Sequence, residues 1–331
     1  MPITAKQLAQ QLGLSTASVS FALNGRPGVS AETRARVLDA ARALGYDPQV
    51  QGRTGKASGT IAFVYYNRRQ IFNTDFFSRM AQGAENALKN SDYELKPFEI
   101  SAIRDIPTQI EHLIRLNPKG ILLLATEMHQ MDFIPFASLD LPIVLLDTCL
   151  SCGVDRIQIN NYEGCRMAVE RLFGRYGQAP GLLNCSGVIS NFVDRNDGYY
   201  LALRQSGVSP TQCISHELAA DQAGAKQDML NIIDSGAPLA KSYFGCWDGV
   251  TLGAMEAFLE RGYRIPEDVG FIGFDNIAEA AQASPSLTTI NVPATYMGSI
   301  AARRILDILQ EDEHHPVVIE IGTSLIARDS A

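Results

Sequence analysis

The chain has 331 residues, of which 46% are hydrophobic, enough for more than one packed core. Residues 1–60 contain seven basic and three acidic side chains, so they carry +4 while the rest of the chain carries −12. A basic head before an acidic body indicates that the head meets a polyanion. No apolar run approaches the ~20 residues that span a bilayer, and no apolar leader follows Met1. We therefore expect a cytoplasmic protein without a membrane partner.

Three short helices are predicted within residues 1–46. Thr4 is placed to cap the first helix, Ser15 the second and Ser30 the third. Short hydroxyl side chains favour these positions because they accept a hydrogen bond from an unpaired backbone N–H at the start of a helix. The head is thus expected to be entirely helical.

The spacing of small and apolar residues is typical of a helix-turn-helix. Ala9 lets two helices cross closely, Gly13 supplies a tight turn, and Val19 packs the second helix against the first. An ordinary helical cap on a larger bundle is the alternative. In a helix-turn-helix, the second helix enters the major groove of double-stranded DNA.

Two groups of head residues are expected to contact DNA. Those on the second helix meet base edges, where hydroxyls hydrogen bond and apolar groups touch thymine methyls. They are Ser15, Thr16, Ala17, Ser18 and Phe21. Those better placed for phosphate, which sets register without reading sequence, are Thr4, Asn24, Ser30 and Tyr46.

Beyond residue 59, short apolar runs alternate with helical stretches. This alternation predicts an α/β body with parallel sheets, and the length fits two such units, or lobes. The expected strands are 61–65, 120–125, 143–147, 181–184, 242–246 and 269–274. Ligands of open α/β sheets bind beyond the carboxyl ends of the strands, so a ligand is expected between the lobes. Polar residues that follow strand ends are Asn67, Thr126, Asp147, Trp247, Asp248 and Asp275.

A long N-terminal segment (3–48) is followed by a series of motifs in a characteristic order. These are Asn160–Gly164, Arg195-x-x-Gly198-Tyr199, Leu252–Met255, Gly262–Val269, Ile272–Asp275 and Pro285–Ile290. Together they resemble the lac repressor/galactose repressor family of transcriptional regulators. The resemblance implies a periplasmic-binding-protein-like body behind a three-helix helix-turn-helix head. The implied ranges are head 1–46, hinge 47–58 and effector-binding and dimerisation domain 59–331, with lobe 1 at about 59–160 and 291–318 and lobe 2 at about 161–290 and 319–331.

The resemblance also selects ligand contacts among the body residues. It implies that Asp275 is an acidic contact and that Arg195 grips ligand oxygens with its fork of donors. Asp147 is a further polar contact, and Phe76 and Phe77 match an aromatic lid. The alternatives are a helix cap for Asp275, a surface position for Arg195 and core packing for the two phenylalanines.

Three features depart from the family pattern. Trp247, the only tryptophan, stands where asparagine is usual, and we expect it to stack on a sugar or another flat apolar face, or else to fill the cleft. Phe21 replaces an arginine that reads guanine in many members. The hinge (47–58) looks short, lacks a leucine wedge and has two glycines, so minor-groove insertion is left open. Arg53 is expected in that groove or on phosphate.

The predicted function is sequence-specific repression of transcription by a nucleoid-associated homodimer. A sugar-like effector between the lobes would control the affinity for operator DNA. No cofactor or metal is expected: the Cys149–Cys152 pair lacks further ligands, although Asp147, Asp248 and Asp275 leave a metal cluster imaginable. A related transport protein would be exported, and an enzyme would need a motif such as G-x-S-x-G or a P-loop, which the sequence lacks.

Overall fold

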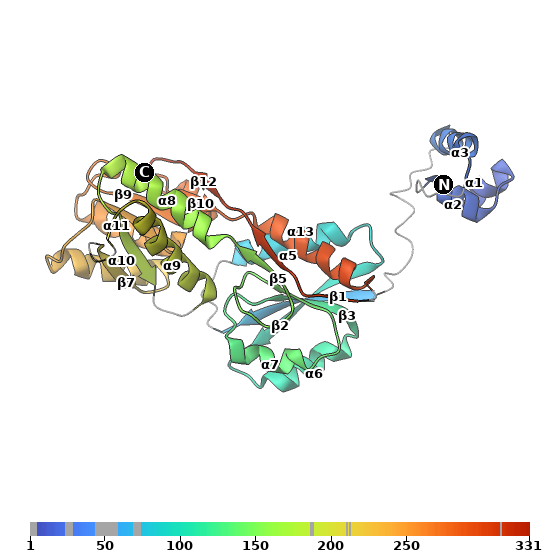
Figure 1. Cartoon of the computed structure of the whole chain (residues 1–331), viewed down its shortest axis with the longest axis horizontal. Helices are drawn as coiled ribbons and strands as arrows, with labels where there is room; N and C mark the ends of the chain where they lie inside the picture. Colours follow the sequence, from blue (N-terminus) through green and yellow to red (C-terminus); the bar gives the residue numbers. More distant parts are fainter. Residues whose placement is uncertain are drawn as a thin grey trace. The chain divides into compact units, whose positions relative to one another are not determined.

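The computed structural model divides into two compact units, Met1–Ser58 and Gly59–Ala331 (Figure 1). The residues that it describes are 5–23, 29–43, 59–68, 74–185, 189–209, 211, 213–311 and 313–331. Thr4 and its predicted cap, Asn24, Tyr46, Arg53 and the hinge lie outside these ranges.

The described part of the first unit is helical, as predicted. It contains α1 (Ala5–Leu12), α2 (Thr16–Leu23) and α3 (Ala31–Ala43). The Ser15 hydroxyl accepts the Ser18 backbone N–H at 3.0 Å, and the Ser30 hydroxyl accepts that of Thr33 at 3.1 Å. Both predicted caps are therefore confirmed.

The turn between α1 and α2 has the geometry that the residue spacing predicts. Gly13 has a φ of +65°, a left-handed conformation that glycine adopts without steric cost. Ala9 and Val19 are buried in one cluster with residues of α3. A small side chain on α1 thus lets α2 pack closely against it.

The first lobe of the second unit is built on a parallel sheet with the strand order β11-β5-β4-β3-β1-β2. Its strands are β1 (Gly59–Asn67), β2 (Tyr93–Ser101), β3 (Pro118–Leu124), β4 (Ile143–Leu146), β5 (Asp155–Ile159) and β11 (Val318–Ile321). One face is covered by α5 (Thr74–Leu88) and α13 (Ala294–Ile308), and the other by α6 (Ile106–Arg115), η1 (Gln130–Phe133) and α7 (Ile134–Ala137) (Figure 1). Alternate residues of β1 enter different clusters, Phe63 beneath α5 and Val64 beneath α6.

The second lobe repeats this layering with the strand order β12-β10-β9-β8-β6-β7, in which β12 is antiparallel. Its strands are β6 (Gly181–Cys185), β7 (Ser215–Leu218), β8 (Ser242–Gly245), β9 (Gly270–Asp275), β10 (Thr288–Asn291) and β12 (Ser324–Ile326). Its helices are α8 (Asn161–Tyr176), α9 (Ser190–Gln205), α10 (Gln222–Asp234), α11 (Asp248–Glu260) and the short α12 (Ala278–Gln282). The predicted α/β class with parallel-dominated sheets in two lobes is confirmed.

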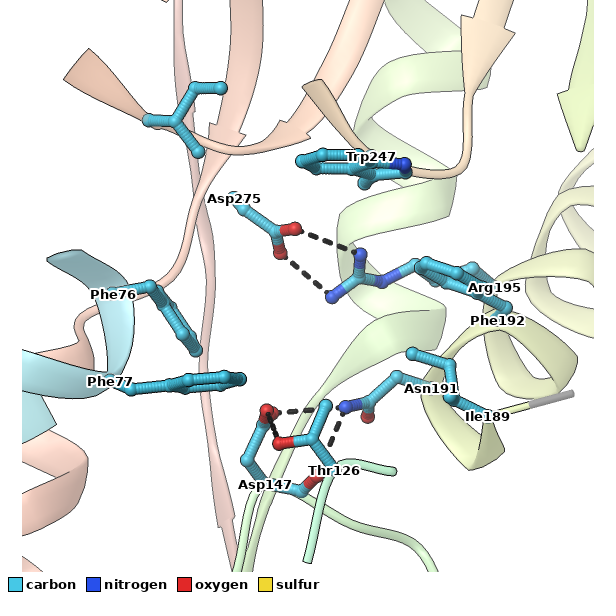
Figure 2. Close-up of a pocket in the computed structure, with 11 residues that line it drawn as sticks. Phe76, Phe77, Thr126, Asp147, Ile189, Asn191, Phe192, Arg195, Trp247 and Asp275 are labelled. Carbon is cyan, nitrogen blue, oxygen red and sulfur yellow. Dashed lines mark hydrogen bonds and ion pairs between the residues drawn. The ribbon is translucent and has the colours of Figure 1, made fainter. Parts of the chain in front are cut away.

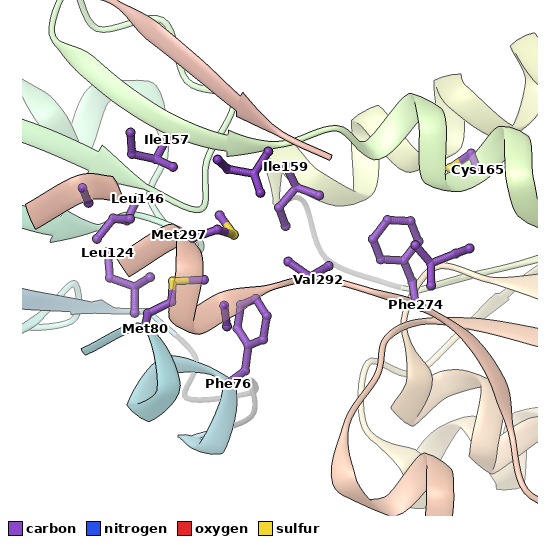
Figure 3. Packing of buried hydrophobic residues seen from close by; sticks show 14 of the residues in the cluster. Phe76, Met80, Leu124, Leu146, Ile157, Ile159, Cys165, Phe274, Val292 and Met297 are labelled. Atoms are coloured by element: carbon purple, nitrogen blue, oxygen red, sulfur yellow. The ribbon is translucent and has the colours of Figure 1, made fainter. Parts of the chain in front are cut away.

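The chain passes between the lobes after β5, after β10 and after β11. The last passage follows Ile321, slightly later than the expected boundary at 318, because β11 pairs in parallel with β5 of the first sheet. Figure 3 shows the packing at these passages: Val292 lies between Met80 of the first lobe and Phe274 of the second. One hydrophobic cluster contains all three side chains, so the lobes share a continuous core.

Helices α5 and α13 cross at two glycines that leave no room for a side chain. A Cβ at Gly298 would lie 1.8 Å from the Met80 carbonyl oxygen, and one at Gly83 would lie 1.9 Å from that of Thr295. The helix backbones therefore touch directly, and neither obstructing atom can rotate away.

We expect Gly298→Ala to destabilise the second unit by about 1–3 kcal/mol through overpacking, although alanine favours a helix over glycine by about 1 kcal/mol. Gly174→Ala is the matched control, because a Cβ on this α8 residue would meet nothing within 4 Å. That control should gain stability. Urea unfolding measures both, and a stabilised Gly298→Ala protein would contradict the close crossing.

Candidate functional site

A cavity of about 30 Å³ lies between the lobes at the carboxyl ends of their strands (Figure 2). It is lined by Phe76, Phe77, Thr126, Asp147, Ile189, Asn191, Phe192, Arg195, Trp247, Asp275 and Ile277. Seven of the eight side chains predicted to bind ligand are among them. The parallel topology explains this convergence, since the residues that follow β3, β4, β8 and β9 emerge at facing sheet edges.

Asn67 is the exception among the predicted ligand residues. Its side-chain amide donates to Glu99 Oε1 at 2.9 Å, across the β1–β2 pair. Asn67 does not line the cavity, so a position after a strand is not by itself enough to identify a lining residue. The neighbouring edge strand supplied a closer acceptor.

Several lining residues were not predicted from the sequence. Ile189, Asn191 and Phe192 come from the start of α9, and Ile277 follows β9. The start of this helix has no side-chain cap to mark it, because the N-cap position is Ile189. The Ser190–Asn191 pair was the available signal for this start.

Arg195 is buried at the centre of the site and paired with Asp275. Its Nη2 lies 2.9 Å from Asp275 Oδ1, and its Nη1 donates to the Cys246 carbonyl at 2.8 Å. Its Nε donates to Asn161 Oδ1 at 3.0 Å, and its Cζ lies 3.8 Å from the centre of the Phe274 ring. Burial opposes its charge, but Asp275 outweighs this and raises the Arg195 pKa. The surface alternative for Arg195 is wrong.

The alternative role for Asp275, a cap on the next helix, is also wrong. The residue before α12 is Ile277, and α12 has no side-chain cap bond. Asp275 instead ends β9 with a φ of +104°, a conformation that non-glycine residues adopt at a cost in strain. This backbone turn aims its carboxylate at Arg195.

Asp248 is buried and holds the loop after β9 in place through hydrogen bonds. Its Oδ1 accepts the Thr289 hydroxyl at 2.6 Å and its Oδ2 accepts the Ile277 backbone N–H at 2.9 Å. Burial raises the pKa of Asp248 to about 8. Asp248 is absent from the cavity lining, and no trio of His, Cys, Asp or Glu side chains among the described residues is arranged for a metal ion.

Asp147 belongs to the first lobe but is bonded from both. Its Oδ2 accepts the Thr126 hydroxyl at 2.5 Å, and its Oδ1 accepts the Asn191 amide of the second lobe at 2.9 Å. Beside it, the Cys149 backbone N–H donates to the Ser190 hydroxyl at 3.0 Å. We call these bonds from Ser190 and Asn191 to the first lobe the interlobe contacts. Burial raises the pKa of Asp147 to about 7.

Aromatic rings form much of the remaining wall. Figure 2 shows Phe76 and Phe77 on one side of the cavity, with Trp247 and Phe192 on others. Trp247 lies flat over Gly249, where a Cβ would be 2.2 Å from the indole ring. Phe76 is 7% exposed and packs in the hydrophobic core, so the core-packing interpretation holds for this residue, while its role as a lid stays a prediction.

Comparison with known proteins assigns both units. Residues 4–49 match the bacterial regulatory proteins of the lacI family, and residues 187–331 match the periplasmic binding protein-like domain. The match to the lacI family is therefore to the head of the chain, and the match to the periplasmic binding protein-like domain is to the later part of the body. It is 27% identical to the HTH-type transcriptional repressor PurR of Pasteurella multocida strain Pm70, over 99% of this chain and 98% of that one.

Solved structures of the family share this fold. A transcriptional regulator CelR–cellobiose complex superposes with a TM-score of 0.73 at 25% identity, covering 99% of this chain and 100% of that one. The lac repressor dimer bound to operator and the anti-inducer ONPF gives 0.71 at 20% identity, covering 100% and 99%. The curated relatives are repressors, which agrees with the expectation that the chain is not an enzyme. Among the described residues, no helix is long and apolar enough to cross a membrane.

The DNA-contact predictions are only partly within the described structure of this lacI-family head. The Ser15 and Ser18 hydroxyls lie 2.8 Å apart at the start of α2. Thr16, Ala17 and Phe21 belong to α2, but their side chains lie outside the described set. All these contacts, with those of Thr4, Asn24, Ser30, Tyr46 and Arg53, stay predictions.

The raised pKa of Asp147 predicts how the free energy of unfolding changes with pH. The folded state holds a proton that the unfolded chain releases near pH 4, so the contribution of this proton to stability is full below pH 4 and is lost as the pH rises through 7. Relative to Asp147→Asn, the wild type should lose about 2–3 kcal/mol between pH 5 and pH 8. Urea unfolding of both proteins at the two pH values measures this difference. An unchanged difference would show that Asp147 is ionised throughout.

A second prediction concerns the buried ion pair. Asp275→Asn leaves the Arg195 charge buried without its counter-ion, so we expect a loss of about 3 kcal/mol in unfolding free energy. Asp268→Asn is the control, because its partner Arg264 is 72% exposed and solvent compensates for the lost charge. Equal effects of the two substitutions would refute the special burial of Arg195.

Proposed function

We propose that this protein is a sequence-specific transcription repressor that binds operator DNA as a homodimer and is controlled by a sugar-like effector in the interlobe cavity. The observation that carries this proposal is a helix-turn-helix head on a chain whose body encloses a cavity lined by the Arg195–Asp275 pair and aromatic rings.

The lining supports a polyhydroxylated ligand. Carboxylate oxygens of Asp147 and Asp275 accept hydrogen bonds from hydroxyl groups, while Trp247, Phe77 and Phe192 offer faces to the C–H surfaces of a sugar ring. The cellobiose in the CelR complex, a structural neighbour with the same two-lobed fold, is a sugar of this kind.

The interlobe contacts suggest how binding changes lobe geometry. Asn191 of the second lobe donates to both the Asp147 backbone carbonyl and its side chain. A ligand hydroxyl that donates to Asp147 would share this carboxylate with the Asn191 amide, and this sharing alters the interlobe contact. An effector that prefers one lobe arrangement shifts its population and thereby the operator affinity.

Dimerisation is proposed because one head is too small for tight, specific binding. A single helix-turn-helix module buries little surface, and two modules read half-sites one helical turn apart. The lac repressor neighbour is a dimer on its operator. The lobes of this chain have the same fold as the lobes of that protein, which supports the proposal that this chain also dimerises.

Selection from a random pool of duplex DNA with the full-length protein tests the DNA-binding half of the proposal. We expect enrichment of a pseudo-palindrome with half-sites about one turn apart, and affinity that falls steeply with salt. Retention without any enriched sequence would contradict specific recognition.

The same enriched DNA then tests the sensor. Gel shifts are repeated with single sugars, and binding is followed through the fluorescence of Trp247, the only tryptophan in the chain. A sugar that changes both fluorescence and operator affinity supports the proposal, whether it releases or promotes DNA binding. A sugar that binds without changing operator affinity would contradict the allosteric part.

A further inference from the structure

The hydrogen-bonding capacity of the cavity is unevenly distributed between donors and acceptors. Arg195 has five N–H donors, and the protein itself takes four of them. Nε bonds Asn161, Nη1 bonds the Cys246 carbonyl and Asp275, and Nη2 bonds Asp275 again. One N–H remains for a ligand, so the expected grip of an arginine fork on ligand oxygens is largely occupied within the protein.

The N–H and O–H donors of the other polar lining side chains, Asn191 and Thr126, also bond to atoms of the protein. The Asn191 amide N–H groups point to Asp147, and its Oδ1 accepts from Asn161 Nδ2 at 3.0 Å. The Thr126 hydroxyl donates to Asp147. The lone pairs that remain belong chiefly to Asp147 and Asp275, since each carboxylate oxygen accepts more than one bond.

The charge balance of the lining points in the same direction. Asp275 neutralises Arg195, and Asp147 adds an acid with no basic partner of its own. No other Lys, Arg or His side chain of the described residues lines the cavity. The described lining residues therefore have zero net charge when Asp147 is protonated and −1 when it is ionised.

We propose that the effector is rich in hydrogen-bond donors and has no negative charge, so that the site takes an unmodified sugar and excludes its phosphorylated or carboxylated derivatives. This inference rests on the proposed function and narrows its ligand class. Among the described lining side chains, an anionic group would meet two carboxyl groups and a single free N–H of Arg195, so it would lose its hydration without replacement. Burial raises the pKa of Asp147, which reduces this repulsion but supplies no positive charge.

The test uses matched pairs of sugars with the full-length protein. The probes are glucose, galactose, ribose and cellobiose, each assayed beside glucose 6-phosphate, galacturonate, ribose 5-phosphate and cellobionate, with Trp247 fluorescence and thermal shift as readouts. For any sugar that binds, we expect its anionic partner to bind at least ~100-fold more weakly, because like-charge juxtaposition costs several kcal/mol. An anionic partner that binds equally well or better would overturn the inference.

A second measurement covers the case in which no sugar of the panel binds. A bacterial small-molecule extract is split on an anion-exchange column, and each fraction is tested for a thermal shift of the protein. Activity in the unretained fraction supports the inference, and activity only in the retained fraction overturns it while leaving the sensor role intact. A shift from neither fraction counts against the effector site and its charge class together.

Asp147→Asn separates charge from shape. Removing this acid should improve binding of the anionic partner about tenfold relative to the neutral sugar, because one like charge is lost. A purely structural effect of the substitution would weaken both ligands alike. Asp268→Asn, which removes an acid at the surface, is the matched control and should leave the ratio unchanged.

Discussion

The buried ion pair between Arg195 and Asp275 connects the segments on which the site depends. Arg195 projects from α9 and bonds the end of β8 through Cys246, the end of β9 through Asp275 and the start of α8 through Asn161. Two charges in a low-dielectric interior stabilise a fold only when their geometry and remaining hydrogen bonds are nearly complete. The same completeness that makes the pair tolerable occupies four of the five N–H donors of Arg195 within the protein.

Asp147 belongs to the same hydrogen-bond network as the ion pair. It is held by Thr126 of its own lobe and Asn191 of the other, and the Asn161 amide joins Asn191 to Arg195. A continuous chain of hydrogen bonds therefore connects Asp147 to the ion pair. Because buried polar networks are costly when partly satisfied, this network is complete only when both lobes contribute their partners.

The sequence predicted those parts of the fold whose signals are local. Apolar runs located β3, β4 and β9 because strands of a parallel sheet covered on both faces are continuously apolar. Strand β2 escaped prediction because it is at the sheet edge, where its residues are mostly half-buried or exposed and include a proline. Residues after strand ends were good site candidates, but which of them point inward depended on neighbours: Asn67 turned to Glu99.

The use of side-chain donors was beyond sequence reasoning altogether. The identity of Arg195 indicated a fork available to a ligand, whereas partners at Asn161, Cys246 and Asp275, far apart in the chain, occupy most of it. Trp247 illustrates the complementary case. Its residue type indicated stacking, but its position depends on Gly249, which leaves space for the indole against the first turn of α11. A side chain at position 249 would displace this ring. The position of Trp247 in the cavity wall is thus set partly by a glycine that does not itself line the cavity.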